Sequence, residues 1–91
     1  MKLLYQIPSM SGSVTKQGFQ EIFGKQVEKL RLAQDLSYRQ LAQRCDLDHS
    51  TISKIEKGEV NIQLSSVLQL SIGLKREPKD LFDFKFDVDK E

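Results

Sequence analysis

Cysteine and histidine are almost missing from this sequence, which contains one of each, Cys45 and His49. A single cysteine excludes an internal disulfide, and one Cys with one His cannot supply a zinc site or a recognisable Cys–His catalytic pair. No Gly-rich phosphate loop is present either. We therefore expect no enzymatic activity, no metal and no cofactor. We interpret Cys45 as a small core hydrophobe, with a redox role as the alternative.

Long hydrophobic runs and an excess of one charge are also missing. No apolar stretch approaches the roughly 20 residues that span a bilayer, and no signal-peptide pattern is present, so we expect a cytoplasmic protein without membrane contact. The net charge of +1 does not by itself indicate a nucleic-acid-binding protein. Residues 25–57, however, contain seven basic and five acidic side chains, whereas residues 77–91 contain three and six. The middle of the chain is therefore the better candidate for contact with a polyanion.

The most informative stretch is residues 37–58, which predicts two short helices joined by a tight turn. Ser37 and Gln40 form a capping box at the start of the first helix. Asp48 is a suitable N-cap for the second helix, and Gly58 is suited to end it. We expect six residues to share one core, with the small alanine at the crossing of the two helices: Leu41, Ala42, Cys45, Leu47, Ile52 and Ile55.

The turn between these two helices needs, on this interpretation, one residue in the left-handed region of backbone conformation. Glycine is the least costly residue there, and aspartate is tolerated. We predict that Asp46 takes this conformation.

The outward face of the second helix is short, basic and rich in hydroxyl groups. At about 100° per residue, four side chains point away from the apolar stripe: Ser50, Ser53, Lys54 and Lys57. His49 lies on the flank, at the start of the helix. Side chains of these types form hydrogen bonds with base edges and phosphates in a major groove. The pattern therefore indicates a surface that reads double-stranded DNA.

This stretch resembles the helix-turn-helix of the Cro/CI-type family, also called lambda-repressor-like or XRE, in Ser-Tyr-Arg-Gln-Leu-Ala from residue 37 and in Leu-Asp-His-Ser-Thr-Ile-Ser-Lys-Ile-Glu-Lys-Gly ending at residue 58. The resemblance extends more loosely over residues 24–82. It implies an all-α fold, a compact five-helix DNA-binding domain, with short terminal β-strands left open as an addition. We accordingly divide the chain into an N-terminal arm or leader (1–15), the helix-turn-helix domain (16–82) and an acidic, aromatic tail (83–91).

Helical periodicity extends the domain on both sides of the motif. We expect a first helix over about residues 16–34, with four residues facing the core: Phe19, Phe23, Val27 and Leu30. A fourth helix is expected over residues 64–74, with these apolar positions: Leu64, Val67, Leu68, Leu70 and Leu74. A short fifth helix would begin at Pro78 and end at Phe82. We expect Leu81 and Phe82 to close the core.

The resemblance also implies which residues contact DNA. Helix 49–57 would enter the major groove, where His49, Ser50 and Lys54 read base edges and Thr51 meets a thymine methyl group. Ser53 lies on the same outward face. Phosphate contacts would come from the start of the preceding helix, the end of the reading helix and the loop that follows: Tyr38, Arg39, Lys57 and Asn61.

An ion pair is a further implication of the resemblance. In the family, an Arg at the position of Arg31 pairs with a Glu near the end of the reading helix, here Glu56. We interpret the pair as structural, because losing one partner of a partly buried pair strands the other. The alternative is two independent surface charges.

The tail alternates apolar and charged residues from 83 to 89, which is the pattern of a β-strand. A lone strand is not stable, so it would pair with residues 2–7 of the same chain or with a second subunit. We favour dimerisation through Phe84, Phe86 and Val88, with a frayed tail as the alternative. Residues 1–15 stay open between a flexible leader and an arm that packs on a partner or reaches DNA.

The function predicted from these features is a sequence-specific, double-stranded DNA-binding transcriptional regulator. A homodimeric repressor that reads a near-palindromic operator is favoured, because one helix reads only a few base pairs. Activation is left open, and a restriction–modification controller is a subtype of this reading. The alternative class is an antitoxin or adaptor that uses the same fold mainly to bind another protein, such as a toxin.

Overall fold

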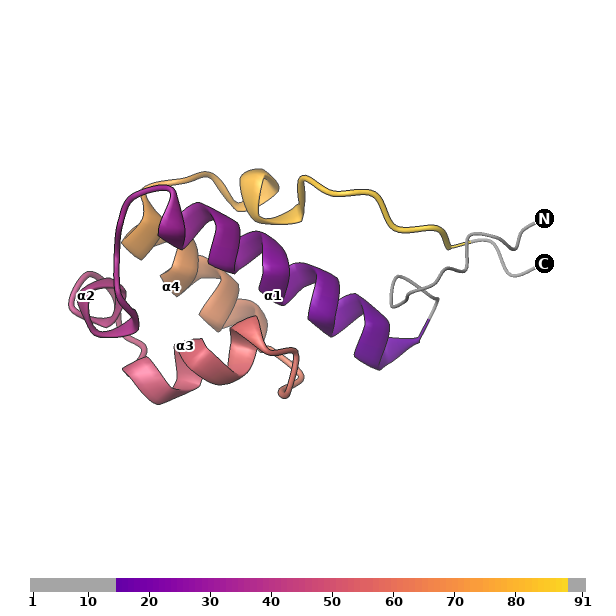
Figure 1. Ribbon diagram of the computed structural model, residues 1–91, viewed down its shortest axis with the longest axis horizontal. Coiled ribbons are helices and arrows are strands. Elements are labelled where there is room, and N and C mark those ends of the chain that lie inside the picture. The colour runs from indigo at the N-terminus through magenta and orange to yellow at the C-terminus, as the bar shows by residue number, and fades with distance from the viewer. Residues whose placement is uncertain (1–14, 89–91) are drawn as a thin grey trace.

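The structure is a computed structural model that describes residues 15–88 (Figure 1). It contains four α-helices and one short 3-10 helix: α1 (Lys16–Leu32), α2 (Tyr38–Ala42), α3 (His49–Glu56), α4 (Leu64–Leu74) and η2 (Pro78–Phe82). Residues 15–88 contain no strand. The predicted all-α fold is therefore confirmed, with the fifth helix in 3-10 form. The proposed arm is outside the described residues, apart from Thr15.

The helix starts follow from capping residues in the sequence. The Thr15 hydroxyl accepts a hydrogen bond from the backbone N–H of Gly18. The predicted capping box of Ser37 and Gln40 is present at the start of α2, and the Asp48 carboxylate caps α3. These side chains satisfy N–H groups that the first turn of a helix leaves without partners. Local chemistry therefore sets where the two helices of the motif begin.

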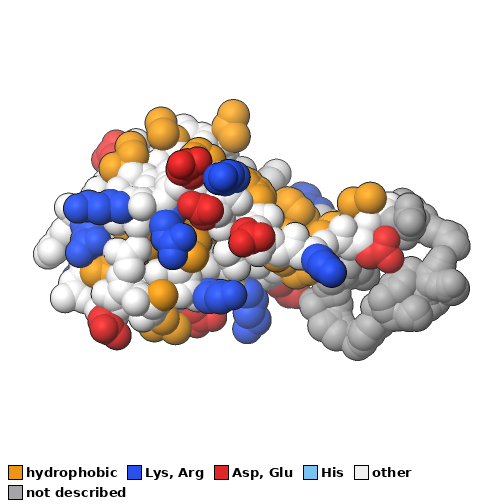
Figure 2. Space-filling model, turned by 90° about the horizontal axis from the view of Figure 1, so that it is seen from above, with side chains coloured by type: hydrophobic (Ala, Val, Ile, Leu, Met, Phe, Trp, Pro, Cys, Tyr) orange, Lys and Arg blue, Asp and Glu red, His pale blue; other side chains and the backbone are white. Residues whose placement is uncertain are grey.

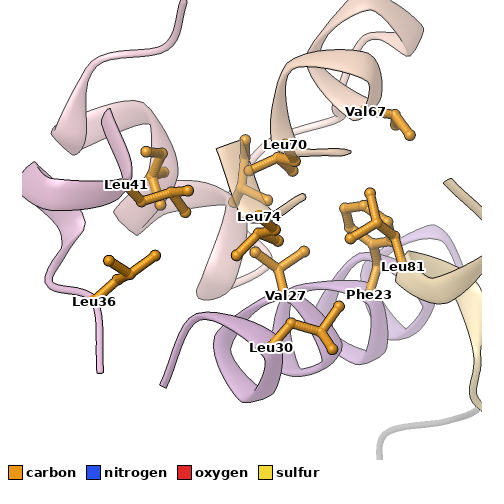
Figure 3. Close-up of a cluster of buried hydrophobic side chains, with 11 residues drawn as sticks. Phe23, Val27, Leu30, Leu36, Leu41, Val67, Leu70, Leu74 and Leu81 are labelled. Atoms are coloured by element: carbon orange, nitrogen blue, oxygen red, sulfur yellow. The ribbon is translucent and has the colours of Figure 1, made fainter. Parts of the chain in front are cut away.

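A single apolar core joins all five helices. In Figure 1, α1 runs through the middle of the molecule, with α3 below it and η2 above it. Figure 3 shows side chains of α1 pointing toward side chains of α4 and η2. Eleven hydrophobic residues are buried: Phe23, Val27, Leu30, Leu36, Leu41, Ile52, Ile55, Val67, Leu70, Leu74 and Leu81. Burial of this set, rather than helix propensity, holds such short helices in place.

The turn between α2 and α3 differs from the prediction. Asp46 does not have a positive φ; among the described non-glycine residues only Asp35 and Lys75 do. The backbone N–H of Asp46 instead donates to Oε1 of Gln69 on α4, at 2.8 Å. A tertiary hydrogen bond thus fixes this turn without a left-handed residue, which sequence spacing could not indicate.

The tail also differs from the prediction, because residues 83–88 form no strand. The rings of Phe84 and Phe86 instead pack edge-on against Phe19, with centroids 5.9 and 5.0 Å apart. Phe19 itself is 40% exposed rather than part of the buried core. Within one chain, the aromatic side chains of the tail therefore pack on α1, and pairing of the tail with a second subunit stays a prediction. The other predicted partner strand, residues 2–7, is outside the described residues.

Helix α4 has two apolar faces, one buried in the core and one exposed. Val67, Leu70 and Leu74 are buried as predicted. Leu64, Leu68 and Ile72 follow one another at intervals of four residues and are 84%, 54% and 50% exposed. We call these three residues the α4 stripe. Residues four apart lie on one face of a helix, so the stripe is a continuous apolar surface without a partner in the described chain.

Candidate nucleic-acid interface

Helix α3 divides into a buried underside and a polar outer face. Ile52 and Ile55 are buried. Ser50, Lys54 and Lys57 are exposed, and three further predicted residues are partly exposed: His49, Thr51 and Ser53. The face that looks away from α3, seen in Figure 2, has acidic and basic side chains side by side without a large area of one sign. The predicted outward placement of the hydroxyl and lysine side chains is confirmed; their contacts with bases and phosphates stay a prediction.

The N-terminal end of α3 is held by bonds within its own first turn. One oxygen of the Asp48 carboxylate accepts from the backbone N–H of Thr51 at 2.8 Å and from the Ser50 hydroxyl at 3.0 Å. The bonds to Thr51, followed by the bond from Ser50, lower the pKa of Asp48 below its usual range. Because the Ser50 hydroxyl donates to Asp48, its oxygen is left as an acceptor on the outer face. An acceptor there suits the amino group of adenine or cytosine.

The C-terminal end of α3 is held by α1. A Cβ atom at Gly24 would fall inside contact distance of the backbone carbonyl oxygens of Ile55 and Glu56. The Gly58 carbonyl accepts from the side-chain amides of both Gln17 and Gln20, at 3.0 Å each. Gly58 has a φ of 73°, so it ends the helix as predicted. These contacts were not predicted from the sequence. Gly24, a glycine inside the predicted first helix, was the one sign in the sequence that another segment approaches α1 closely.

The predicted ion pair between Arg31 and Glu56 is confirmed. Arg31 Nε and Nη2 donate to the two carboxylate oxygens of Glu56 at 2.7 and 3.0 Å. Arg31 Nη1 donates to the carbonyl oxygen of Leu36 at 2.7 Å. Both charged residues are buried, and the hydrogen bond with Glu56 raises the pKa of Arg31 further above its ordinary value. The alternative of two independent surface charges is therefore wrong.

The predicted phosphate-binding residues fall into two groups. Tyr38 and Lys57 line one hollow of about 430 Å³ beside the end of α3, together with Lys25 of α1 and three acidic residues, Glu21, Glu28 and Glu56. Arg39 and Asn61 are exposed but do not line it. The Tyr38 ring also lies over the Arg31 guanidinium, 4.3 Å from Cζ to the ring centroid. Sequence reasoning missed this stacking.

Comparison with known proteins shows the family to which this chain belongs. The helix-turn-helix family model HTH_3 matches residues 27–81, which is more than half of the chain. The chain belongs to the Cro/CI-type helix-turn-helix family. Its membership, together with the relatives below, identifies it as a DNA-binding transcriptional regulator. Within residues 15–88, none of the helices has the length and apolar character to cross a membrane.

Several relatives of this family member are controller proteins. Control protein C.BamHI of Bacillus amyloliquefaciens is 41% identical over 64 residues, which cover 69% of this chain and 79% of the relative. Control protein C.MunI of a Mycoplasma species is 37% identical over 70 residues, covering 76% and 90%. The crystal structure of the restriction-modification controller protein C.AhdI from Aeromonas hydrophila matches with a TM-score of 0.68 and 36% identity, over 70% of this chain and 97% of that one.

Proposed function

We propose that this helix-turn-helix regulator is the controller of a restriction–modification system and that it acts in the cytoplasm as a homodimer on a near-palindromic operator. The observation that carries the DNA-reading part is the exposed face of α3, which presents hydroxyl and lysine side chains while its underside is clamped to α1. The three controller relatives support the narrower role. Repression would follow from steric exclusion of the polymerase; we keep activation open.

The residues of the DNA-reading surface would make two kinds of contact, one with base edges and one with phosphates. His49, Ser50 and Lys54 would form hydrogen bonds with base edges, and Thr51 would contact a thymine methyl group. Phosphate contacts set the register without reading sequence. We assign them to the residues at the edges of the surface: Tyr38, Arg39, Lys57 and Asn61.

The α4 stripe supports the dimer better than the tail does. A stripe of three exposed aliphatic residues is self-complementary when two copies meet about a two-fold axis. Two of the three tail residues proposed for dimerisation, Phe84 and Phe86, already contact Phe19 of their own chain. Val88 is 74% exposed and stays a candidate at the edge of such an interface. We therefore place the main contact between subunits on α4.

DNA binding is tested by selecting bound duplexes from a random pool and then titrating the selected duplex against salt. Specific binding should weaken linearly on a log–log plot as salt rises, because bound phosphates release counterions. Lys54→Ala should lower both affinity and base preference, typically by about 1–3 kcal/mol at the base that it reads. Lys79→Ala removes the same charge from η2 and serves as the matched control. Equal, weak binding of random and selected duplexes would favour the antitoxin or adaptor class instead.

The dimer is tested by placing a charge on the α4 stripe. Leu68→Glu should shift the protein from dimer to monomer in sedimentation equilibrium, because it buries a charge in an apolar interface. Leu32→Glu is the matched control, since Leu32 at the end of α1 is also 54% exposed. If both variants stay dimeric, α4 is not part of the interface. A wild-type monomer that captures a second protein through α4 would also favour the adaptor class.

A further inference from the structure

The guanidinium of Arg31 joins three segments of the chain. Its hydrogen bonds reach Glu56 at the end of α3 and the carbonyl oxygen of Leu36 in the turn before α2, while its own backbone belongs to α1. Three of its five N–H groups are therefore engaged in the plane of the group. This one side chain therefore links the end of α3 both to α1 and to the turn before α2.

The remaining surface of the guanidinium is its flat face, and Tyr38 covers one side of it. The ring centroid is 4.3 Å from Arg31 Cζ. Tyr38 directly follows the N-cap Ser37, whose capping box with Gln40 fixes the backbone at the start of α2. The ring is thus held over Arg31 by a local motif, independently of the ion pair itself. Stacking on an aromatic face suits Arg, whose guanidinium is planar and weakly hydrated.

We infer that the Tyr38 ring is a positioning element for the reading helix, separate from any phosphate contact made by the Tyr38 hydroxyl; this inference builds on the proposed DNA-binding function. The ring keeps water from the face of the Arg31–Glu56 pair, whose strength depends on low local polarity. With the pair protected, Glu56 keeps α3 at the angle that docks its outer face in a groove. The hydroxyl has no hydrogen-bond partner within residues 15–88, so the two functions reside in different parts of one side chain.

Two substitutions separate the ring from the hydroxyl. Tyr38→Phe keeps the ring and removes the hydroxyl, so it should reduce affinity for selected and random duplexes by the same factor and leave their ratio unchanged. Tyr38→Leu removes both, so the ratio should fall by about tenfold, the size expected for a desolvated cation–π contact. If the ratio of the affinities for selected and random duplexes is the same in the Phe and Leu variants, the inference is overturned. An equal fall in both variants would assign the effect to the hydroxyl, and an unchanged ratio in both would show that neither part of the side chain positions the helix.

A measurement without DNA distinguishes this inference from the proposed function. The Nε–H signal of Arg31 in a two-dimensional NMR spectrum should carry a ring-current shift and exchange slowly with water in the wild type and in Tyr38→Phe. In Tyr38→Leu the shift should vanish and exchange should accelerate by about tenfold. An unchanged Arg31 signal in the Leu variant would refute the positioning role of the Tyr38 ring, whatever the DNA result. Failure of the wild type to select any duplex would refute the proposed function while the NMR result still stands.

Discussion

The two ends of α3 are held in different ways. At the C-terminal end, α1 contacts the helix backbone at Gly24, binds Glu56 through Arg31 and donates two side-chain amides to Gly58. At the N-terminal end, the bonds to Asp48 come from residues of the same first turn. The anchored end sets the direction of the helix, and the locally capped end presents side chains outward. Substitutions at the C-terminal end should therefore lower the stability of the fold more than substitutions at the N-terminal end. Substitutions at the N-terminal end should mainly change which duplex is bound.

The largest effect is expected from breaking the anchor at Arg31. Arg31→Ala leaves Glu56 as an uncompensated buried charge, so the free energy of unfolding should fall by about 3–5 kcal/mol. Urea denaturation followed by circular dichroism measures this change. Arg39→Ala is the control, because Arg39 is exposed and should shift the free energy of unfolding by less than about 0.5 kcal/mol. Equal stability losses in both variants would contradict the comparison.

A smaller loss is expected where α1 crosses the end of α3. Gly24→Ala forces a methyl group against two backbone carbonyls that cannot move without shifting a helix, which should cost about 1–3 kcal/mol. In Gly73→Ala the new methyl group meets side-chain atoms instead of backbone: Cδ1 of Leu41, and Cβ and Sγ of Cys45. These side chains can adjust, so the control should lose less stability in the same denaturation experiment. A larger loss at Gly73 would show that the crossing is less rigid than the contacts indicate.

The smallest effect is expected from the cap at the other end of the helix. Because the pKa of Asp48 is lowered in the folded protein, the carboxylate stabilises the fold above its ordinary pKa. This contribution is lost as pH falls below about 4. Asp48→Asn keeps a capping side chain that does not titrate. The stability of the wild type should therefore decline more steeply with acid than that of the variant, measured by denaturation between pH 7 and pH 2. Parallel pH profiles would contradict the lowered pKa.

Local chemistry made most of the motif predictable. Ser37, Asp48 and Gly58 mark helix ends by interactions within a few residues, so the sequence around them carries the full signal. The Arg31–Glu56 pair spans 25 positions, and only the resemblance to a known family indicated it. The outward face of α3 followed from helical periodicity alone.

The features that the sequence did not indicate depend on contacts between distant segments. Asp46 takes an ordinary conformation because Gln69, 23 residues away, binds its N–H. A glycine inside a helix ordinarily weakens it, whereas the missing side chain of Gly24 admits the backbone of α3. Alternation in the tail predicted a strand, but Phe84 and Phe86 found Phe19 on α1. These contacts join residues that become neighbours only when the helices pack. The pattern of residue types along the chain therefore does not indicate them.

The contact between Gln69 and Asp46 bears on how the regulator would respond to its own abundance. Gln69 ties α4 to the turn that leads into the reading helix, and the outer side of α4 carries the stripe that we assign to self-association. If pairing along α4 precedes DNA binding, operator occupancy at low levels grows with about the square of the chain's concentration, by mass action. Regulation would then begin abruptly once synthesis passes a threshold concentration.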